Sequence, residues 1–300
     1  MSKEFKEIIE QLPAFKVDYW TTNKCDMNCF GCFGAISPIE EEMGLKEIHT
    51  VFYKLYKAGA RMATLTGGEP LIKKETVKTI KFLDELGFRI NLSTNGTFLM
   101  NNYSEIKNHV WKISLSLDGS DKEKNELVGR REYHFENIVN ILKFFKDNPP
   151  NHLVKVGTVV SKLNILDVQN IGNILFNNNN LYKPNDWRLL QFFPTNNPKR
   201  ALANKELLEI SDKDFLNTVN QVRNVFPEAN ITAKPAKDDI YQYVFITPDG
   251  FMQIKKGNEC RVSVDLKTIN QSSLDKIIKL HKDIAKKTID DYLNFNGIKI

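Results

Sequence analysis

Stretches typical of strands alternate with stretches typical of helices along most of this 300-residue chain. The expected strands are short apolar runs, at residues 15–22, 62–65, 88–92, 110–117, 153–160 and 187–193. The expected helices cover residues 45–58, 75–86, 103–108, 134–146, 165–176 and 215–225. Such alternation predicts parallel strands joined by right-handed crossovers. Six units of this kind predict an α/β fold, an open partial (βα)6 barrel related to the eight-stranded barrel.

The alternation stops after about residue 235. The sequence there predicts a β-hairpin that turns at Pro248-Asp249-Gly250, followed by a terminal helix over residues 274–285. We therefore expect three parts, namely an N-terminal helical segment, the partial barrel, and a hairpin-and-helix extension packed on the barrel, over residues 1–14, 15–235 and 236–300.

Composition restricts the kind of partner. The 42 basic and 37 acidic residues give a net charge of +5, which mildly favours an anionic substrate but is too balanced to indicate a nucleic-acid binder. No apolar run approaches the length of a membrane span, and no apolar segment follows the charged N-terminus as in a secretion signal. Four cysteines, three of them clustered, argue against a disulfide framework. We expect a cytoplasmic protein that binds neither membrane nor nucleic acid.

The three clustered cysteines are Cys25, Cys29 and Cys32, which follow the first expected strand. Thiolates hold iron–sulfur clusters and structural zinc. Three thiolates on a 4Fe–4S cluster leave one iron open to a substrate or cofactor. The alternative is a zinc site that takes Cys260 as its fourth ligand, and the spacing alone does not decide between the two.

Other candidate binding residues follow the ends of the next strands, where (β/α) barrels carry their chemistry. Glycines allow a backbone to approach a ligand closely, and short polar side chains suit hydroxyl and amino groups. The alternatives are helix capping and turn formation for the short polar residues, an ordinary strand-to-helix turn for the glycines and the glutamate, and a surface position for the arginine. The candidates are Gly67, Gly68, Glu69, Asn95, Ser116, Asp118 and Arg130.

Two basic residues, Lys155 and Arg188, lie on the fifth and sixth expected strands. Side chains alternate along a strand, so both could point into the barrel. A charge inside a barrel is costly without an anionic partner, which a bound phosphate would supply. The alternative, that both point outward or sit at strand ends, fits the sequence nearly as well.

The cysteine trio, followed some forty residues later by Gly67-Gly68-Glu69-Pro70, resembles the radical S-adenosylmethionine (SAM) superfamily. The resemblance implies a partial barrel and a 4Fe–4S cluster whose open iron is chelated by SAM. An electron from the reduced cluster, supplied by a donor such as flavodoxin or ferredoxin, cleaves SAM to a 5′-deoxyadenosyl radical that abstracts hydrogen. It also implies that Glu69 accepts a hydrogen bond from the SAM ammonium and that Arg130, near the start of a helix, is free to pair with the SAM carboxylate. One position departs from the family, because Gly31, between Phe30 and Cys32, stands where an aromatic residue usually lies near the adenine.

Several segments resemble the viperin family of antiviral radical SAM enzymes, among them Leu127-Val128-Gly129-Arg130, Val154-Lys155-Val156 and Trp187-Arg188-Leu189-Leu190-Gln191. Viperins dehydrate CTP to 3′-deoxy-3′,4′-didehydro-CTP. The likeness covers roughly residues 15–260 and implies a nucleoside-triphosphate dehydratase, a lyase, with Lys155 and Arg188 at the triphosphate and Tyr243 as the catalytic tyrosine. One position departs from the viperins, because Asp186, two residues before Arg188, stands where they have a basic residue. The alternatives are a radical SAM enzyme that modifies a ribosomal peptide or another small molecule and, outside the enzymes, a zinc-binding structural protein.

Overall fold

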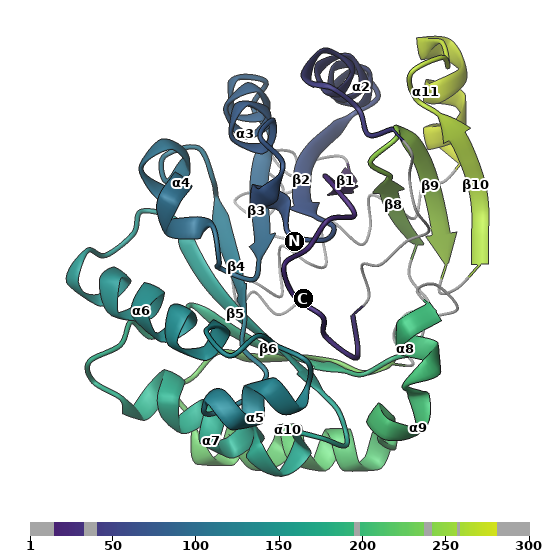
Figure 1. The fold of residues 1–300 in the computed structure, drawn as a ribbon. Coiled ribbons are helices and arrows are strands. Elements are labelled where there is room, and N and C mark those ends of the chain that lie inside the picture. The colour runs from purple at the N-terminus through teal and green to yellow at the C-terminus, as the bar shows by residue number, and fades with distance from the viewer. Residues whose placement is uncertain (1–14, 33–40, 195–198, 237–241, 257–258, 281–300) are drawn as a thin grey trace, which may run out of the picture.

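One curved sheet forms the frame of the molecule, with helices on its outer side (Figure 1). The computed structural model describes residues 15–32, 41–194, 199–236, 242–256 and 259–280. The sheet order is β10-β9-β8-β1-β2-β3-β4-β5-β6-β7. The first six strands are β1 (Phe15–Trp20), β2 (Ala60–Thr66), β3 (Arg89–Thr94), β4 (Lys112–Ser116), β5 (Leu153–Val160) and β6 (Asp186–Gln191). All six run parallel in chain order, so the predicted α/β fold with a partial barrel is confirmed.

Four further strands extend this sheet at its two edges. They are β7 (Ile231–Lys234), β8 (Gln242–Ile246), β9 (Phe251–Lys256) and β10 (Glu259–Asp265). The sequence analysis missed β7 and β10, whereas β8 and β9 are the predicted hairpin. Since β8 pairs in parallel with β1, the C-terminal strands continue the barrel sheet. The boundaries expected at residues 14/15 and 235/236 stay predictions, and residues 1–14 lie outside the described part.

The helices that follow the strands cover the outer face of the sheet (Figure 1). They bury apolar stripes at helical spacing, as Ile48, Val51, Phe52 and Leu55 do on the first of them. The α-helices in the described part of the chain are α2 (Leu45–Lys57), α3 (Thr76–Glu85), α4 (Leu99–Ile106), α5 (Lys122–Leu127), α6 (His134–Asp147), α7 (Val168–Gly172), α8 (Lys199–Ala203), α9 (Lys205–Leu208), α10 (Asp212–Val225) and α11 (Gln271–Leu280). In the part of the chain that the structure describes, no helix has the length and apolar character needed to cross a bilayer.

The two faces of the strands differ in chemistry, as β5 illustrates. Val154 and Val156 are fully buried against the helices, while Lys155 alternates with them and lies on the inner face. Lys155 is in register with Ser114, and Gly157 is in register with both Ser116 and Arg188. Residues paired in a sheet point to the same side, so the inner face of the barrel is polar and basic.

Candidate functional site

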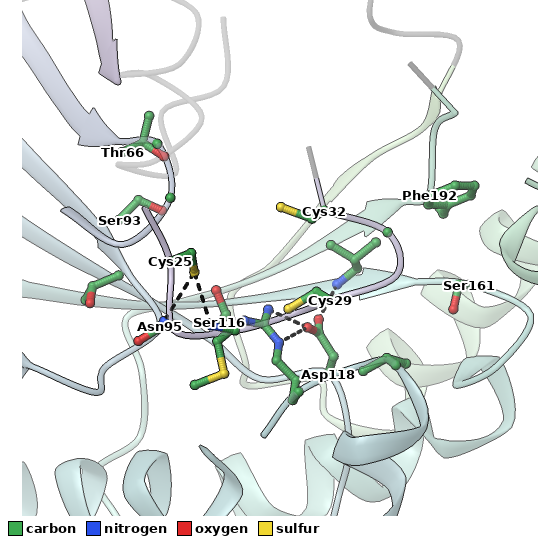
Figure 2. A pocket seen from close by; sticks show the side chains of 18 of the residues that line it. Cys25, Cys29, Cys32, Thr66, Ser93, Asn95, Ser116, Asp118, Ser161 and Phe192 are labelled. Atoms are coloured by element: carbon green, nitrogen blue, oxygen red, sulfur yellow. Dashed lines mark hydrogen bonds and ion pairs between the residues drawn. The ribbon is translucent and has the colours of Figure 1, made fainter. Parts of the chain in front are cut away.

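A cavity of about 350 Å³ lies at the carboxyl ends of β1 to β6. Each of these strands contributes at or just after its end: Trp20, Thr66, Ser93, Ser116, Val159 and Phe192. The loop that carries the three cysteines forms another side of the cavity (Figure 2). The structure therefore brings together segments far apart in sequence at the edge where barrel enzymes hold their ligands.

Nine of the residues singled out from the sequence line this cavity. They come from five separate segments: Cys25, Cys29, Cys32, Gly67, Gly68, Asn95, Ser116, Asp118 and Arg130. The fold brings these nine residues to one cavity, and the ligand that each of them binds stays a prediction.

The cysteine loop carries three thiols that face the cavity, and none of the three is in a disulfide bond. Among the described residues, no three His, Cys, Asp or Glu side chains surround a single metal ion. A structural zinc ion gathers four ligands at about 2.0–2.3 Å, whereas a four-iron cluster places each thiolate on a different iron. Three thiols on one loop match in number the three thiolates of a four-iron cluster that leaves one iron open.

Two glycines after β2 let the backbone lie directly against the start of the cysteine loop. Gly67 has a φ of +125°, and a Cβ on Gly68 would overlap the carbonyl oxygen of Lys24. Here Gly68 N donates to Thr22 O at 2.8 Å, and Glu69 N donates to Lys24 O at 2.9 Å. The glycines thus fix the two loops to each other at the edge of the cavity.

Glu69 is fully buried and is not among the described residues that line the cavity. Its carboxylate accepts hydrogen bonds from Thr94 Oγ1 at 2.7 Å, Asn95 N at 2.8 Å and Leu71 N at 3.1 Å. Burial raises its pKa to about 7, and these hydrogen bonds oppose the shift. The carboxylate thus ties the segment after β2 to the end of β3, and its expected contact with the SAM ammonium stays a prediction.

Asp26, which the sequence analysis did not single out, fixes the cysteine loop to its surroundings. Its Oδ1 accepts a hydrogen bond from Asn95 Nδ2 at 2.7 Å and its Oδ2 accepts one from Tyr133 Oη at 2.9 Å. Arg131 Nε donates to its carbonyl oxygen at 3.2 Å. Asn95 therefore lines the cavity while it holds the residue that follows Cys25.

Asp118 and Arg130 form an ion pair at the side of the cavity. Arg130 donates to Asp118 Oδ2 from Nη2 at 2.6 Å and from Nε at 2.9 Å, and both side chains are nearly buried. Asp118 Oδ1 also accepts a hydrogen bond from Val159 N at 2.8 Å. Arg130 was expected near the start of a helix and free to pair with a ligand. It lies in the loop between α5 and α6, shortly before α6 begins, and its charge is already compensated by Asp118, so its pairing with the SAM carboxylate stays a prediction.

Lys155 and Arg188 lie on the inner face of the barrel, so the alternative that both point outward does not hold. Burial, together with the charges of Arg188 and Lys112, lowers the pKa of Lys155 well below its ordinary value, and Asp186 opposes this shift. Arg188 Nε donates to Thr232 Oγ1 at 3.3 Å, and this hydroxyl donates to Asp186 Oδ1 at 2.8 Å.

Tyr243 lies in β8, in register with Lys255, and Cys260 lies in β10. Their side chains fall outside the described part, so their roles stay predictions. The cavity also has apolar residues that the sequence analysis did not single out, including Trp20, Phe192 and Leu208. Trp20 ends β1 and Phe192 follows β6. A rule that accepted apolar as well as polar residues at strand ends would have found both.

Comparison with known proteins identifies the family of this chain. The model of the radical SAM superfamily matches residues 20–172, just over half of the chain. The chain is 28% identical over 262 residues to an S-adenosylmethionine-dependent nucleotide dehydratase of Lacinutrix mariniflava, across 81% of this chain and 50% of that protein. It thus spans half the length of this relative. A GTP 3′,8-cyclase of Clostridium perfringens is 26% identical over 261 residues, which is 77% of each chain.

Solved structures agree in fold. Streptococcus suis SuiB bound to S-adenosylmethionine superposes with a TM-score of 0.68 at 14% identity, over 85% of this chain and 64% of that one. SuiB bound to its precursor peptide SuiA gives a TM-score of 0.66 at 13% identity, over 88% and 65%. With its parallel sheet, its three clustered cysteines in the loop after β1 and the family match, this chain belongs to the radical SAM superfamily, whose members use a 4Fe–4S cluster and S-adenosylmethionine.

Proposed function

We propose that this protein is a nucleotide-modifying radical SAM enzyme, with dehydration of CTP to 3′-deoxy-3′,4′-didehydro-CTP as the first candidate reaction. The observation that carries the proposal is the pair of basic residues, Lys155 and Arg188, on the inner face of the barrel below the cofactor cavity. Both relatives compared by sequence, the nucleotide dehydratase and the GTP cyclase, are named for reactions on nucleotides.

The geometry supports an anionic substrate. Ser116 lines the cofactor cavity and is in register with Gly157, which is in register with Arg188. Lys155 lies two residues before Gly157 on β5, so it is on the same face and farther from the rim of the barrel, by which we mean the carboxyl ends of the strands and the loops that follow them. A triphosphate there would compensate the mutual repulsion of Lys155 and Arg188, and a guanidinium can hold a phosphate with two parallel hydrogen bonds. The ribose would then lie between the triphosphate and the cavity.

In this proposal Cys25, Cys29 and Cys32 hold the cluster, and the polar residues of the rim hold SAM. Cluster and SAM together supply a carbon radical that removes a hydrogen atom. Ser93, Asn95 and Ser116 offer hydroxyl and amide groups to the ribose and the amino-acid part of SAM. A small one-electron carrier such as a flavodoxin or ferredoxin would supply the electron. Asp186, beside Lys155 and hydrogen-bonded through Thr232, keeps the inner face from carrying a larger positive charge.

The test is a substrate panel under reducing, anaerobic conditions. The reconstituted full chain is given SAM, dithionite and each nucleoside triphosphate in turn, and the release of 5′-deoxyadenosine is measured. We expect CTP to raise the release above the substrate-free rate, and to do so far less with Arg188→Ala than with the surface control Lys146→Ala. If no nucleoside triphosphate stimulates the wild-type protein, the proposal fails and modification of a peptide or another small molecule takes its place.

A further inference from the structure

The cofactor cavity has two chemically different sides. Figure 2 shows Cys29 and Cys32 between Ser93 on one side and Phe192 on the other. The side with Ser93 also carries Asn95 and Ser116, which are polar. On the opposite side Val159, Phe192 and Leu208 form an apolar wall, with the hydroxyl side chain of Ser161 near it (Figure 2).

The apolar side rests on a small hydrophobic cluster that is separate from the main core. Phe192, Ala201 and Leu208 form this cluster and are 1–2% exposed, and Phe30, Val159 and Leu163 pack against it. Phe192 comes from the end of β6 and Leu208 from α9, while Phe30 belongs to the cysteine loop. The cluster thus fixes a flat aromatic ring at the wall of the cavity, beside the cysteines.

Gly31 leaves the space that this ring occupies. A Cβ built on Gly31 would lie 3.2 Å from the Phe192 ring and 3.5 Å from a methyl carbon of Leu208. Gly31 is not among the glycines with positive φ, so its backbone conformation would accept a side chain. Glycine at position 31 therefore allows the Phe192 ring to pack directly against the cysteine loop.

We propose that Phe192 is the residue that binds the adenine ring of SAM, and that Gly31 is its required packing partner. Adenine is the flat apolar part of SAM, whereas its ribose, sulfonium and amino-acid parts are polar or charged. An aromatic wall on one side of the cysteines and hydroxyl and amide groups on the other match this division. Aromatic side chains bind nucleobases by stacking, which does not need a hydrogen-bonding pattern. The inference rests on the family's cofactors and not on the nucleotide substrate proposed above.

The test measures equilibrium binding to the anaerobically reconstituted protein. The ligands are S-adenosylhomocysteine, which carries the adenine, and methionine, which does not. Iron content and thermal unfolding of each variant show whether the cluster and the fold are intact. With Phe192→Ala, the dissociation constant for S-adenosylhomocysteine should rise roughly 10-fold or more, because losing one aromatic–base stack has about that effect. Phe192→Leu, which keeps the wall apolar and the loop packed, should lose roughly 3-fold or more. Methionine binding should not change in either variant.

Exchange of the two positions separates stacking from packing. Gly31→Phe alone should weaken binding, because two rings then compete for one space. The double variant Gly31→Phe/Phe192→Ala places a ring at the same wall from the other segment, and its affinity should recover to within roughly 3-fold of wild type. The proposal is overturned if Phe192→Leu binds S-adenosylhomocysteine as tightly as wild type. It is also overturned if the double variant retains its cluster yet binds no better than the weaker single variant.

Discussion

The rim and the inner face of the barrel differ in how their charges are balanced. At the rim, Asp118 neutralises Arg130 directly, and Glu69 is surrounded by hydrogen-bond donors. On the inner face, Lys155 lies near Arg188 and Lys112, which oppose its charge, and Asp186 is the acidic neighbour that favours it. The charges at the rim are therefore balanced within the protein, whereas the positive charges of the inner face favour a bound anion. We infer from this difference that the cofactors belong at the rim and the substrate on the inner face.

The largest effect is expected at the cysteines, since the whole rim is arranged around them. Cys29→Ala should leave the reconstituted protein without a stable cluster and abolish reductive SAM cleavage, because a four-iron cluster held by two thiolates is lost. Iron content and 5′-deoxyadenosine release measure the outcome. Cys260→Ala is the matched control and should retain iron near the wild-type level. Equal loss of iron in both variants would contradict the assignment and revive the zinc alternative.

The next effect concerns the inner face alone. Lys155→Ala and Arg188→Ala should each weaken the binding of a nucleoside triphosphate by about 2–5 kcal/mol, as truncating one partner of a buried charged contact does. In steady-state kinetics the apparent KM for CTP should rise, while substrate-free SAM cleavage continues at the wild-type rate. A drop in substrate-free cleavage would show that these residues also support the rim.

The ion pair of Asp118 and Arg130 should stabilise the rim without any bound ligand. Asp118→Ala leaves the nearly buried guanidinium of Arg130 without its partner, which should lower the free energy of unfolding by about 3–5 kcal/mol. Denaturant unfolding of the cluster-free protein measures this. The double variant Asp118→Ala/Arg130→Met removes both charges and should recover much of the loss. If the double variant is less stable than Asp118→Ala, the unpaired charge is not the cause.

The smallest effect is a proton taken up when the substrate binds. The pKa of Lys155 is lowered in the free protein, chiefly by burial and then by Arg188 and Lys112. A bound triphosphate favours the charged form and raises this pKa, so at a pH between the two values binding takes up a fraction of a proton. Affinity should therefore fall as the pH rises through this interval. Calorimetry of CTP binding in two buffers of different ionisation enthalpy measures the uptake. Lys155→Ala should abolish it, and an uptake that persists in this variant would assign it to another group.

Much of the fold could be predicted from the sequence because each parallel strand is an apolar run and each helix has an apolar stripe. The edge strand β7 is harder to recognise, since its four residues include a threonine and a lysine. The short helix α5 has one buried residue, Asn125, so it lacks the apolar pattern. These elements are fixed by tertiary contacts that a local pattern does not contain.

The members of the site could be predicted in part, because strand ends converge in a parallel barrel. Their partners could not. Asp118 and Arg130 are separated by α5, and their pairing depends on how that helix turns the chain back. The direction of the Glu69 carboxylate depends on where β3 ends. Phe192 was missed because only polar residues were considered at the strand ends, and its contact with Gly31, about 160 residues away in the sequence, has no local signal.

The most direct test of the difference between rim and inner face is the binding of two ligands to one variant. The affinities of the reconstituted protein for S-adenosylhomocysteine and for CTP are measured separately, on wild type and on Arg188→Ala. We predict that the variant binds S-adenosylhomocysteine as wild type does and loses most of its affinity for CTP. Unchanged CTP binding, or equal loss of both ligands, would contradict the assignment of the substrate to the inner face.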